Sequence, residues 1–174
     1  KYHPDFDDVL DKILKEIPQA KLFVFANEAS FETQKVKSRW KKNSKLILKK
    51  TIIYPRVEFD QFLAIIKTLD IILDPFYFGM GNTFYQAMAV GTPIVSFKEF
   101  RFSSRFAYVA YKQMNIDNPP IANSPEEYIA LCKKLAFDPT YRQKLSLEIL
   151  TKSRKSLFND NSVYLEYIEF MKAS

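Results

Sequence analysis

The feature that organises this chain is the stretch at residues 73–96, LDPFYFGMGNTFYQAMAVGTPIVS, which holds all three glycines, Gly79, Gly81 and Gly91. Glycine is kept where the backbone needs a positive φ angle or must let a ligand come close. Because this chain of 174 residues has only three glycines and all of them lie in one stretch, that stretch is expected to contain a functional site. We therefore expect the chemistry of the protein in the glycine loop, which we define as residues 74–81.

Strand and helix patterns alternate on both sides of this loop. Apolar spacing, prolines and capping residues predict helices at residues 4–17, 31–43, 59–69, 82–90, 103–113, 124–136, 139–156 and 162–172. Strands are predicted at residues 21–26, 50–54, 70–74 and 93–97, with an edge strand at 120–122. The fold class is therefore α/β, with a single Rossmann-like parallel sheet flanked by helices and a helical C-terminal portion. The ligand crevice of such a sheet lies at the carboxyl ends of its strands, where the glycine loop begins.

Composition sets the class of protein. A 47% hydrophobic content with 16% aromatic residues excludes disorder and predicts one domain, residues 1–174, with a real core. No run approaches the roughly 20 apolar residues of a membrane span, and the polar first residues look like a helix start within a longer, soluble chain. The single cysteine, Cys132, excludes an intrachain disulfide and favours a reducing compartment, the cytoplasm.

The net charge of +6 owes much to one basic segment, in which Trp40 is the only aromatic residue. Its cations are Lys35, Lys37, Arg39, Lys41, Lys42, Lys45, Lys49 and Lys50. Nucleic-acid binding would need better-spaced stacking aromatics, so a solvated helix face is the expectation. We expect no nucleic-acid partner and no membrane partner.

The glycine loop leads into a helix whose free N–H groups and positive dipole end would point into the crevice, a ready anion site. A Cβ at Gly79 or Gly81 would keep the backbone away from phosphate oxygens, while Asn82 and Thr83 can cap the helix and donate hydrogen bonds. An ordinary strand-to-helix turn with a good cap is the alternative, because the spacing matches neither a Walker loop nor the dinucleotide fingerprint.

Seven short motifs, spread over the whole chain, carry a family resemblance. They are Lys1-x-His-Pro-Asp-Phe-Asp7, Pro55-Arg-Val57, Phe62-Leu63, Leu73-Asp-Pro-Phe76, Gly79-Met-Gly-Asn-Thr83, Ala89-Val-Gly-Thr-Pro-Ile-Val95 and Ser103-Ser-Arg-Phe-Ala107. The chain resembles the C-terminal, nucleotide-sugar-binding half of the catalytic region of O-GlcNAc transferase and SPINDLY-like glycosyltransferases, the family-41 group with the GT-B fold. The resemblance implies a UDP-sugar donor, no cofactor and no metal.

The resemblance also implies how the diphosphate of the donor is bound. Lys1 matches a lysine that neutralises charge on the departing UDP, although a solvated terminal lysine is the alternative. Asn82 and Thr83 match the turn that contacts the diphosphate. Gly81 stands where the animal enzymes carry a histidine, so any contact of that imidazole is absent. His3 is expected to position the Lys1 segment.

Four further positions match the nucleoside side of the family's site. Phe62 matches a residue that stacks on the uracil, but it also lies on an apolar stripe of its helix. Both alternatives, a platform for the base and a core residue, therefore stay open. Backbone near Val57 is expected at the uracil edge. Gln86 replaces an aspartate that accepts hydrogen bonds from the ribose, the main departure from the pattern. Arg105 matches an arginine that faces the cleft, with a structural ion pair as the alternative.

These matches imply the donor domain of an inverting glycosyltransferase that passes N-acetylglucosamine or glucose from UDP to a protein side chain. The polypeptide acceptor and the general base would belong to an N-terminal half outside this fragment, behind tetratricopeptide-like repeats, so the fragment alone is predicted inactive. Two other interpretations stay open: a non-catalytic nucleotide-sugar or phosphate-binding module, and a GT-B enzyme with a lipid or glycan acceptor.

Overall fold

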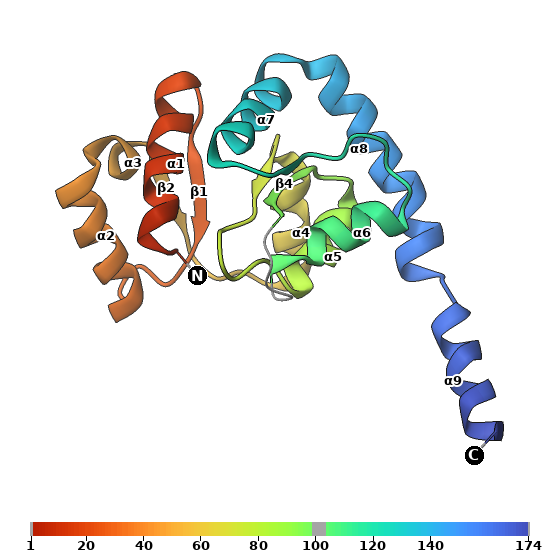
Figure 1. Cartoon of the computed structure of the whole chain (residues 1–174). Helices are drawn as coiled ribbons and strands as arrows, with labels where there is room; N and C mark the ends of the chain where they lie inside the picture. Colours follow the sequence, from red (N-terminus) through yellow and green to blue (C-terminus); the bar gives the residue numbers. More distant parts are fainter. Residues whose placement is uncertain (1, 99–103, 174) are drawn as a thin grey trace.

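Parallel strands surrounded by helices make up the computed structural model of this chain, which describes residues 2–98 and 104–173 (Figure 1). The helices are α1 (Pro4–Glu16), α2 (Phe31–Asn43), α3 (Lys45–Lys50), α4 (Phe59–Thr68), α5 (Asn82–Val90), α6 (Phe106–Gln113), α7 (Pro125–Phe137), α8 (Pro139–Ser153) and α9 (Ser162–Ala173), and a π-helical turn, Arg154–Phe158, follows α8. The strands are β1 (Leu22–Phe25), β2 (Thr51–Tyr54), β3 (Ile72–Leu73), β4 (Ile94–Phe97) and β5 (Ile121–Ala122).

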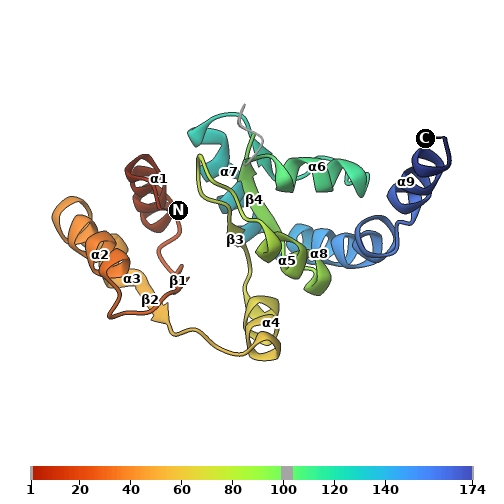
Figure 2. The ribbon, with the colours of Figure 1, turned by 90° about the horizontal axis from the view of Figure 1, so that it is seen from below.

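All strand pairings in the described residues are parallel, which confirms the predicted α/β class. The strands form two hydrogen-bonded groups, β1-β2 and β3-β4-β5, with β5 on an edge as predicted. The expected single sheet is therefore divided between β1 and β3, and Figure 2 shows the two groups on either side of this division. β3 is only two residues long, so it offers few groups for a ladder to a second neighbour.

The predicted elements match the structure within a few residues, except that α3 was not predicted. Ser44 caps α3, because its Oγ accepts a hydrogen bond from the amide of Ile47 at 3.3 Å, and the Ile47 side chain is fully buried. A six-residue helix has too few turns for an apolar stripe to stand out in the sequence. Ser103, where the helix before Gln113 was expected to begin, lies outside the described residues.

Two buried tyrosines hold β4 and the strand end that precedes the glycine loop. The Tyr111 hydroxyl accepts a hydrogen bond from the Ile94 amide at 2.9 Å, and it lies 3.1 Å from the Ile94 carbonyl. The Tyr128 hydroxyl lies 3.1 Å from the carbonyl of Asp74 and 3.0 Å from that of Val95. Burial raises the pKa of both phenols, so they stay neutral donors. The helices α6 and α7 thus fix the position of the loop.

The basic segment is not uniformly solvated. Trp40 is only 1% exposed and belongs to the core, where its Nε1–H donates to Asp7 at 2.9 Å. Arg39 pairs with the same carboxylate, with Nε 2.6 Å from Oδ2 and Nη2 2.9 Å from Oδ1. The expectation of a solvated face holds for Lys41 and Lys42, which are exposed, and is wrong for Arg39, which ties α2 to α1.

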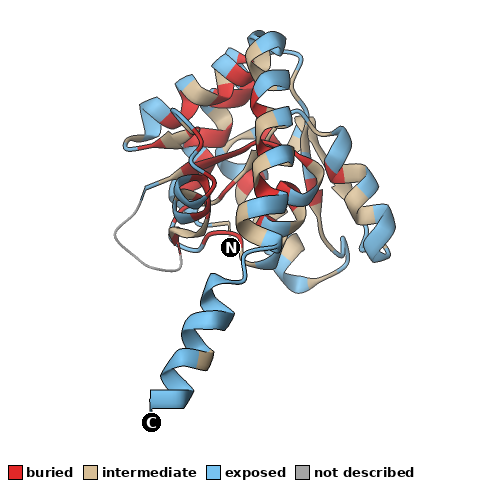
Figure 3. Ribbon diagram, turned by 90° about the vertical axis from the view of Figure 1, so that its right-hand side faces the viewer, coloured by how far each residue is buried: buried red, intermediate tan, exposed pale blue. Residues whose placement is uncertain are grey.

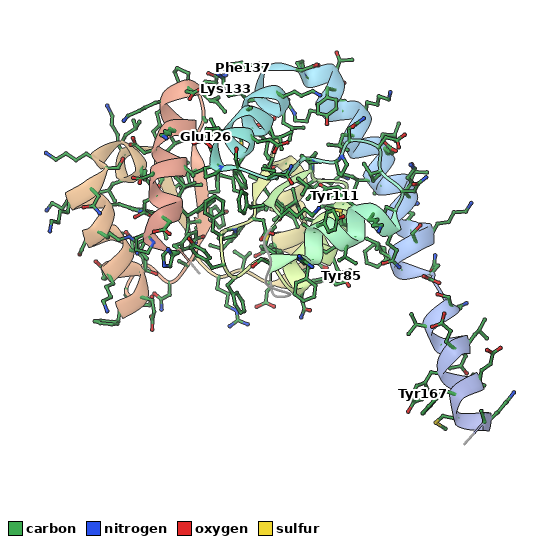
Figure 4. All side chains as sticks on the ribbon, in the orientation of Figure 1. Tyr85, Tyr111, Glu126, Lys133, Phe137 and Tyr167 are labelled. Atoms are coloured by element: carbon green, nitrogen blue, oxygen red, sulfur yellow. The ribbon has the colours of Figure 1, made fainter. Side chains whose placement is uncertain are left out.

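The C-terminal helix α9 extends away from the rest of the chain (Figures 1 and 3). None of its described residues is buried, and six of its apolar side chains are more than half exposed: Val163, Tyr164, Leu165, Tyr167, Phe170 and Met171. Figure 4 shows Tyr167 on this projecting helix, whereas Tyr111 lies within the body of the molecule. Among the described residues, no helix has both the length and the apolar character needed to cross a bilayer.

Cys132 is expected to be unreactive in the native protein. Its side chain in α7 is fully buried, and burial raises the pKa of the thiol above its usual value, so little thiolate forms. Reaction with a disulfide reagent at pH 8 should be roughly 100-fold or more slower in buffer than in denaturant. A Phe137→Cys variant, at a position 55% exposed on the same helix, should supply one fast-reacting thiol. Comparable native-state rates for the two thiols would contradict the prediction.

Candidate functional site

The glycine loop is anchored by Asp74, which directly follows β3. This carboxylate is 3% exposed, and its Oδ1 accepts a hydrogen bond from the Met80 amide at 2.7 Å. Its Oδ2 accepts from the Ser96 hydroxyl of the neighbouring strand β4, also at 2.7 Å. The two ends of the loop are therefore linked to each other and to the sheet. Asp74 and Ser96 were not among the predicted site residues. The position of Asp74, directly after an apolar strand, is the feature of the sequence that could have indicated its role.

The helix that follows begins differently from the expectation. Gly81 occupies the cap position of α5, with φ −88° and ψ −111°, and no side chain caps the helix. Asn82 and Thr83 are the first two helical residues, so the expectation that their side chains cap it is wrong. The Phe84 amide donates to the Gly81 carbonyl at 2.9 Å, which leaves the amides of Asn82 and Thr83 without an acceptor in residues 2–98 and 104–173.

The described part of the chain leaves space in front of this helix start. Within residues 2–98 and 104–173, a Cβ added to Gly81 would meet no atom within 4 Å beyond its chain neighbours, so packing among these residues does not require glycine there. Asn82 is exposed and Thr83 is half-buried. Two free amides, the positive end of the helix dipole and an unobstructed approach together make a cradle for an anionic group.

Gly91 has a different role from Gly81. It ends α5 in the left-handed conformation, with φ 80°, and a Cβ there would lie 2.9 Å from the Ser146 carbonyl of α8. Its own conformation and the close contact with α8 account for this glycine without a ligand. Gly79 is buried within the loop. The structure thus accounts for Gly91 by its place at a helix end, while a role of Gly81 in ligand binding stays a prediction.

An aromatic cluster lies at the carboxyl ends of β1 and β2. The ring of Phe25 stands edge-on to Tyr54 at 5.8 Å and to Phe62 of α4 at 4.9 Å. Phe62 is half-buried, so its side chain is neither fully packed in the core nor fully exposed. Val57, between β2 and α4, is also half-buried. This rim is where a parallel α/β sheet places a nucleoside.

A cavity of about 940 Å³ separates β1 from β3 and reaches this rim. Most of its wall is apolar, and Phe62 and Thr83 both line it. The cavity runs along the whole gap between β1 and β3, and core residues such as Leu10 and Cys132 also line it. A parallel α/β sheet binds its ligand outside the carboxyl ends of the strands, so only the end of the cavity near Phe62 and Thr83 is a candidate for ligand binding.

The N-terminal segment touches the glycine loop through Tyr77, which has a left-handed backbone with φ 68°. Its hydroxyl donates to Asp5 Oδ2 at 2.6 Å, and its ring stands edge-on to His3 at 4.6 Å. His3 also caps α1, because its Nδ1 accepts from the Asp5 amide at 3.3 Å. The residues just after Lys1 therefore lie against the loop. Lys1 itself is outside the described residues.

The remaining predicted residues lie on α5 and at the start of α6. Gln86 is half-buried one turn after Asn82, on the same helix face. Arg105 directly precedes α6, is half-buried and does not cap the helix with its side chain, although it has other interactions within the chain. Among the described residues, no group of three His, Cys, Asp or Glu side chains could hold a metal ion.

Comparison with known proteins identifies the fold. No protein-family model matches the sequence, and no curated protein is significantly similar to it. A solved structure of a lysine-to-methionine variant of the O-GlcNAc transferase of Thermobaculum terrenum is similar over 97% of this chain, with a TM-score of 0.83 and 19% sequence identity. The match covers 32% of that transferase, so this chain spans about a third of its length. The chain therefore has a glycosyltransferase-like α/β fold, similar to one part of an O-GlcNAc transferase.

Proposed function

We propose that this chain is the donor-binding half of an inverting glycosyltransferase that uses a UDP-sugar. The observation that carries the proposal is the start of α5. Among the described residues, the amides of Asn82 and Thr83 have no acceptor there, and a Cβ at Gly81 would meet no atom within 4 Å beyond its chain neighbours. The position of this cradle at the carboxyl rim of a glycosyltransferase-like sheet supports a nucleotide as the anion.

In this proposal the diphosphate of the donor accepts hydrogen bonds from the first amides of α5 and from the side chains of Asn82 and Thr83. The uracil lies near Phe62 and the backbone of Val57, and the ribose lies near Gln86. The half-buried ring of Phe62 can stack on the uracil, and the side-chain amide of Gln86 can accept a hydrogen bond from a ribose hydroxyl.

The reaction we propose is a single displacement at the anomeric carbon of the sugar. An acceptor hydroxyl attacks from the face opposite to UDP, the new C–O bond forms, and the bond to the diphosphate breaks with both electrons leaving on its oxygen. A base in another part of the protein takes the hydroxyl proton. Lys1, Arg105 and the dipole of α5 would stabilise the charge that develops on UDP, without a metal.

The acceptor is proposed to be a polypeptide side chain and the sugar N-acetylglucosamine or glucose, in the cytoplasm. Because the chain spans about a third of the similar transferase, acceptor binding and the base would come from an N-terminal half with helical repeats. The isolated chain should therefore bind UDP without transferring sugar. Turnover of UDP-sugar by the isolated chain would contradict this division of roles.

Titration calorimetry with UDP tests the proposal. We expect a micromolar dissociation constant for UDP and weaker binding of ADP. Gly81→Ala should weaken UDP binding by about tenfold, or ~1.4 kcal/mol, because the new methyl group occupies the space of a phosphate oxygen. Lys1→Ala should weaken it by a similar factor of about ten, whereas Lys172→Ala, on the exposed helix α9, should not change it. Absence of UDP binding at millimolar concentration would refute the proposal.

A non-catalytic nucleotide-sugar module is the second candidate, and Gln86 favours it, because an amide replaces the charged ribose acceptor of the resembled family. The two candidates differ in the longer protein: only the enzyme should release UDP from a UDP-sugar when an acceptor peptide is added. A glycan or lipid that replaces the peptide as acceptor would point to a GT-B enzyme of another specificity.

A further inference from the structure

We propose that Asp74 is a positioning residue that holds the glycine loop in the shape required to bind the donor diphosphate; this inference rests on the proposed function. Asp74 lies at the carboxyl end of β3 and is 3% exposed. Its two carboxylate oxygens are bound to two different parts of the chain, the Met80 amide and the Ser96 hydroxyl, both at 2.7 Å. No contact of Asp74 with the ligand is part of the proposal.

The first of these hydrogen bonds fixes the backbone directly before the cradle. Met80 precedes Gly81, the cap of α5, and its amide belongs to the Gly79–Met80 peptide unit, two units before the one that carries the Asn82 amide. A carboxylate that holds this unit restrains the backbone from which the amides of Asn82 and Thr83 follow. Hydrogen bonds to a charged acceptor are stronger than neutral ones, and this one is shielded from water.

The second hydrogen bond and the backbone of Asp74 attach this arrangement to the sheet. Ser96 lies on β4 and is 1% exposed, so its hydroxyl is held in place by the strand. The Asp74 carbonyl lies 3.1 Å from the buried hydroxyl of Tyr128. Both the side chain and the main chain of Asp74 are thus held, and the loop is positioned relative to β4 and α7.

The effect of Asp74→Ala on UDP binding distinguishes a positioning role from a purely electrostatic one. A carboxylate near an anion site repels UDP, so its removal should tighten binding if Asp74 acted only through its charge. A positioning role predicts weaker binding after Asp74→Ala, because the loop loses its anchor. Asp74→Asn should retain much of the affinity, since its Oδ1 can still accept from Met80 and its amide can donate to the Ser96 Oγ.

The test compares UDP binding and amide hydrogen exchange in four variants of the same chain. We expect Asp74→Ala to weaken UDP binding by about tenfold or more, Ser96→Ala by about threefold, and Asp74→Asn by less than about threefold. In the absence of UDP, the Met80 amide, which loses its acceptor, should exchange about tenfold or more faster in Asp74→Ala, while the amides of α8 should not change. Thr92→Ala is the control, since Thr92 is of similar burial, 3% exposed, and its hydroxyl donates to the Ile66 carbonyl of α4 at 2.8 Å and not to the glycine loop.

Thr92→Ala should lower stability but leave the dissociation constant of UDP unchanged at temperatures where the variant is folded. Unchanged or tighter UDP binding by Asp74→Ala would overturn the inference, as would unchanged exchange of the Met80 amide. If Asp74→Ala does not fold, the UDP affinities of Ser96→Ala and Asp74→Asn still test the inference. Ser96→Ala binding UDP as tightly as the native chain would then overturn it. If the native chain does not bind UDP, the proposed function fails, and the exchange data alone decide whether Asp74 orders the loop.

Discussion

Replacement of Gly91 by alanine is expected to lower the free energy of unfolding by about 2–4 kcal/mol. Gly91 has φ 80°, a left-handed conformation that costs other L-residues about 1–2 kcal/mol. Its new Cβ would lie 2.9 Å from the Ser146 carbonyl and 3.2 Å from the Leu150 Cβ, so α8 would have to move. The contact with Ser146 involves backbone, which cannot rotate away as a flexible side chain does.

Denaturation by urea, followed by circular dichroism, measures this effect. Gly81→Ala is the matched control, because among the described residues its Cβ would meet no atom within 4 Å beyond its chain neighbours; we expect a change of less than about 1 kcal/mol. The two variants should therefore have different effects: Gly91→Ala should mainly lower the free energy of unfolding, and Gly81→Ala should mainly weaken UDP binding. Equal losses of stability would show that the two glycines do not have the different roles described above.

Removal of the Asp7 carboxylate is the second large effect. Asp7→Ala should lower the free energy of unfolding by about 2–4 kcal/mol, because the Trp40 indole N–H and the Arg39 guanidinium both lose their acceptor. We set the value below the loss for a fully enclosed pair because the Arg39 side chain is 24% exposed and water can partly solvate it.

The fluorescence of Trp40, the only tryptophan, reports this transition directly, since the indole is buried in the native state. Asp8→Ala is the matched control: Asp8 is the next residue on α1 but is exposed, and a change within about 0.5 kcal/mol is expected. A loss for Asp7→Ala no larger than that for Asp8→Ala would mean that the buried network does not hold α1 to α2.

Most of the secondary structure followed from local patterns. The apolar spacing of α1, the continuous apolar run of β1 and the turn from β3 into α5 each depend on residues within a few positions of one another, so the sequence was sufficient to place them. The same patterns predicted the parallel α/β class. The short helix α3 was missed because it depends on the burial of Ile47, which no local pattern reveals.

The candidate site was only partly predictable. The sequence located the glycine loop and the start of α5, but it did not distinguish Gly81, whose surroundings are open, from Gly91, which packs against α8. It also did not indicate that Asp74 accepts from Ser96, 22 positions further along the chain. The roles of Phe62, Val57, Gln86, Arg105 and Lys1 stay predictions for the binding experiments.

The sequence by itself determined the order of helices and strands, their parallel connection and the place of the loop, because spacing, prolines and caps act between near neighbours. Only the tertiary structure decided which side chains meet: Asp7 with Arg39 and Trp40, and Tyr77 with His3 and Asp5. It also decided that the strands form two groups with a cavity between them. Contacts of this kind join residues far apart in the chain, and they depend on how the helices pack against the strands.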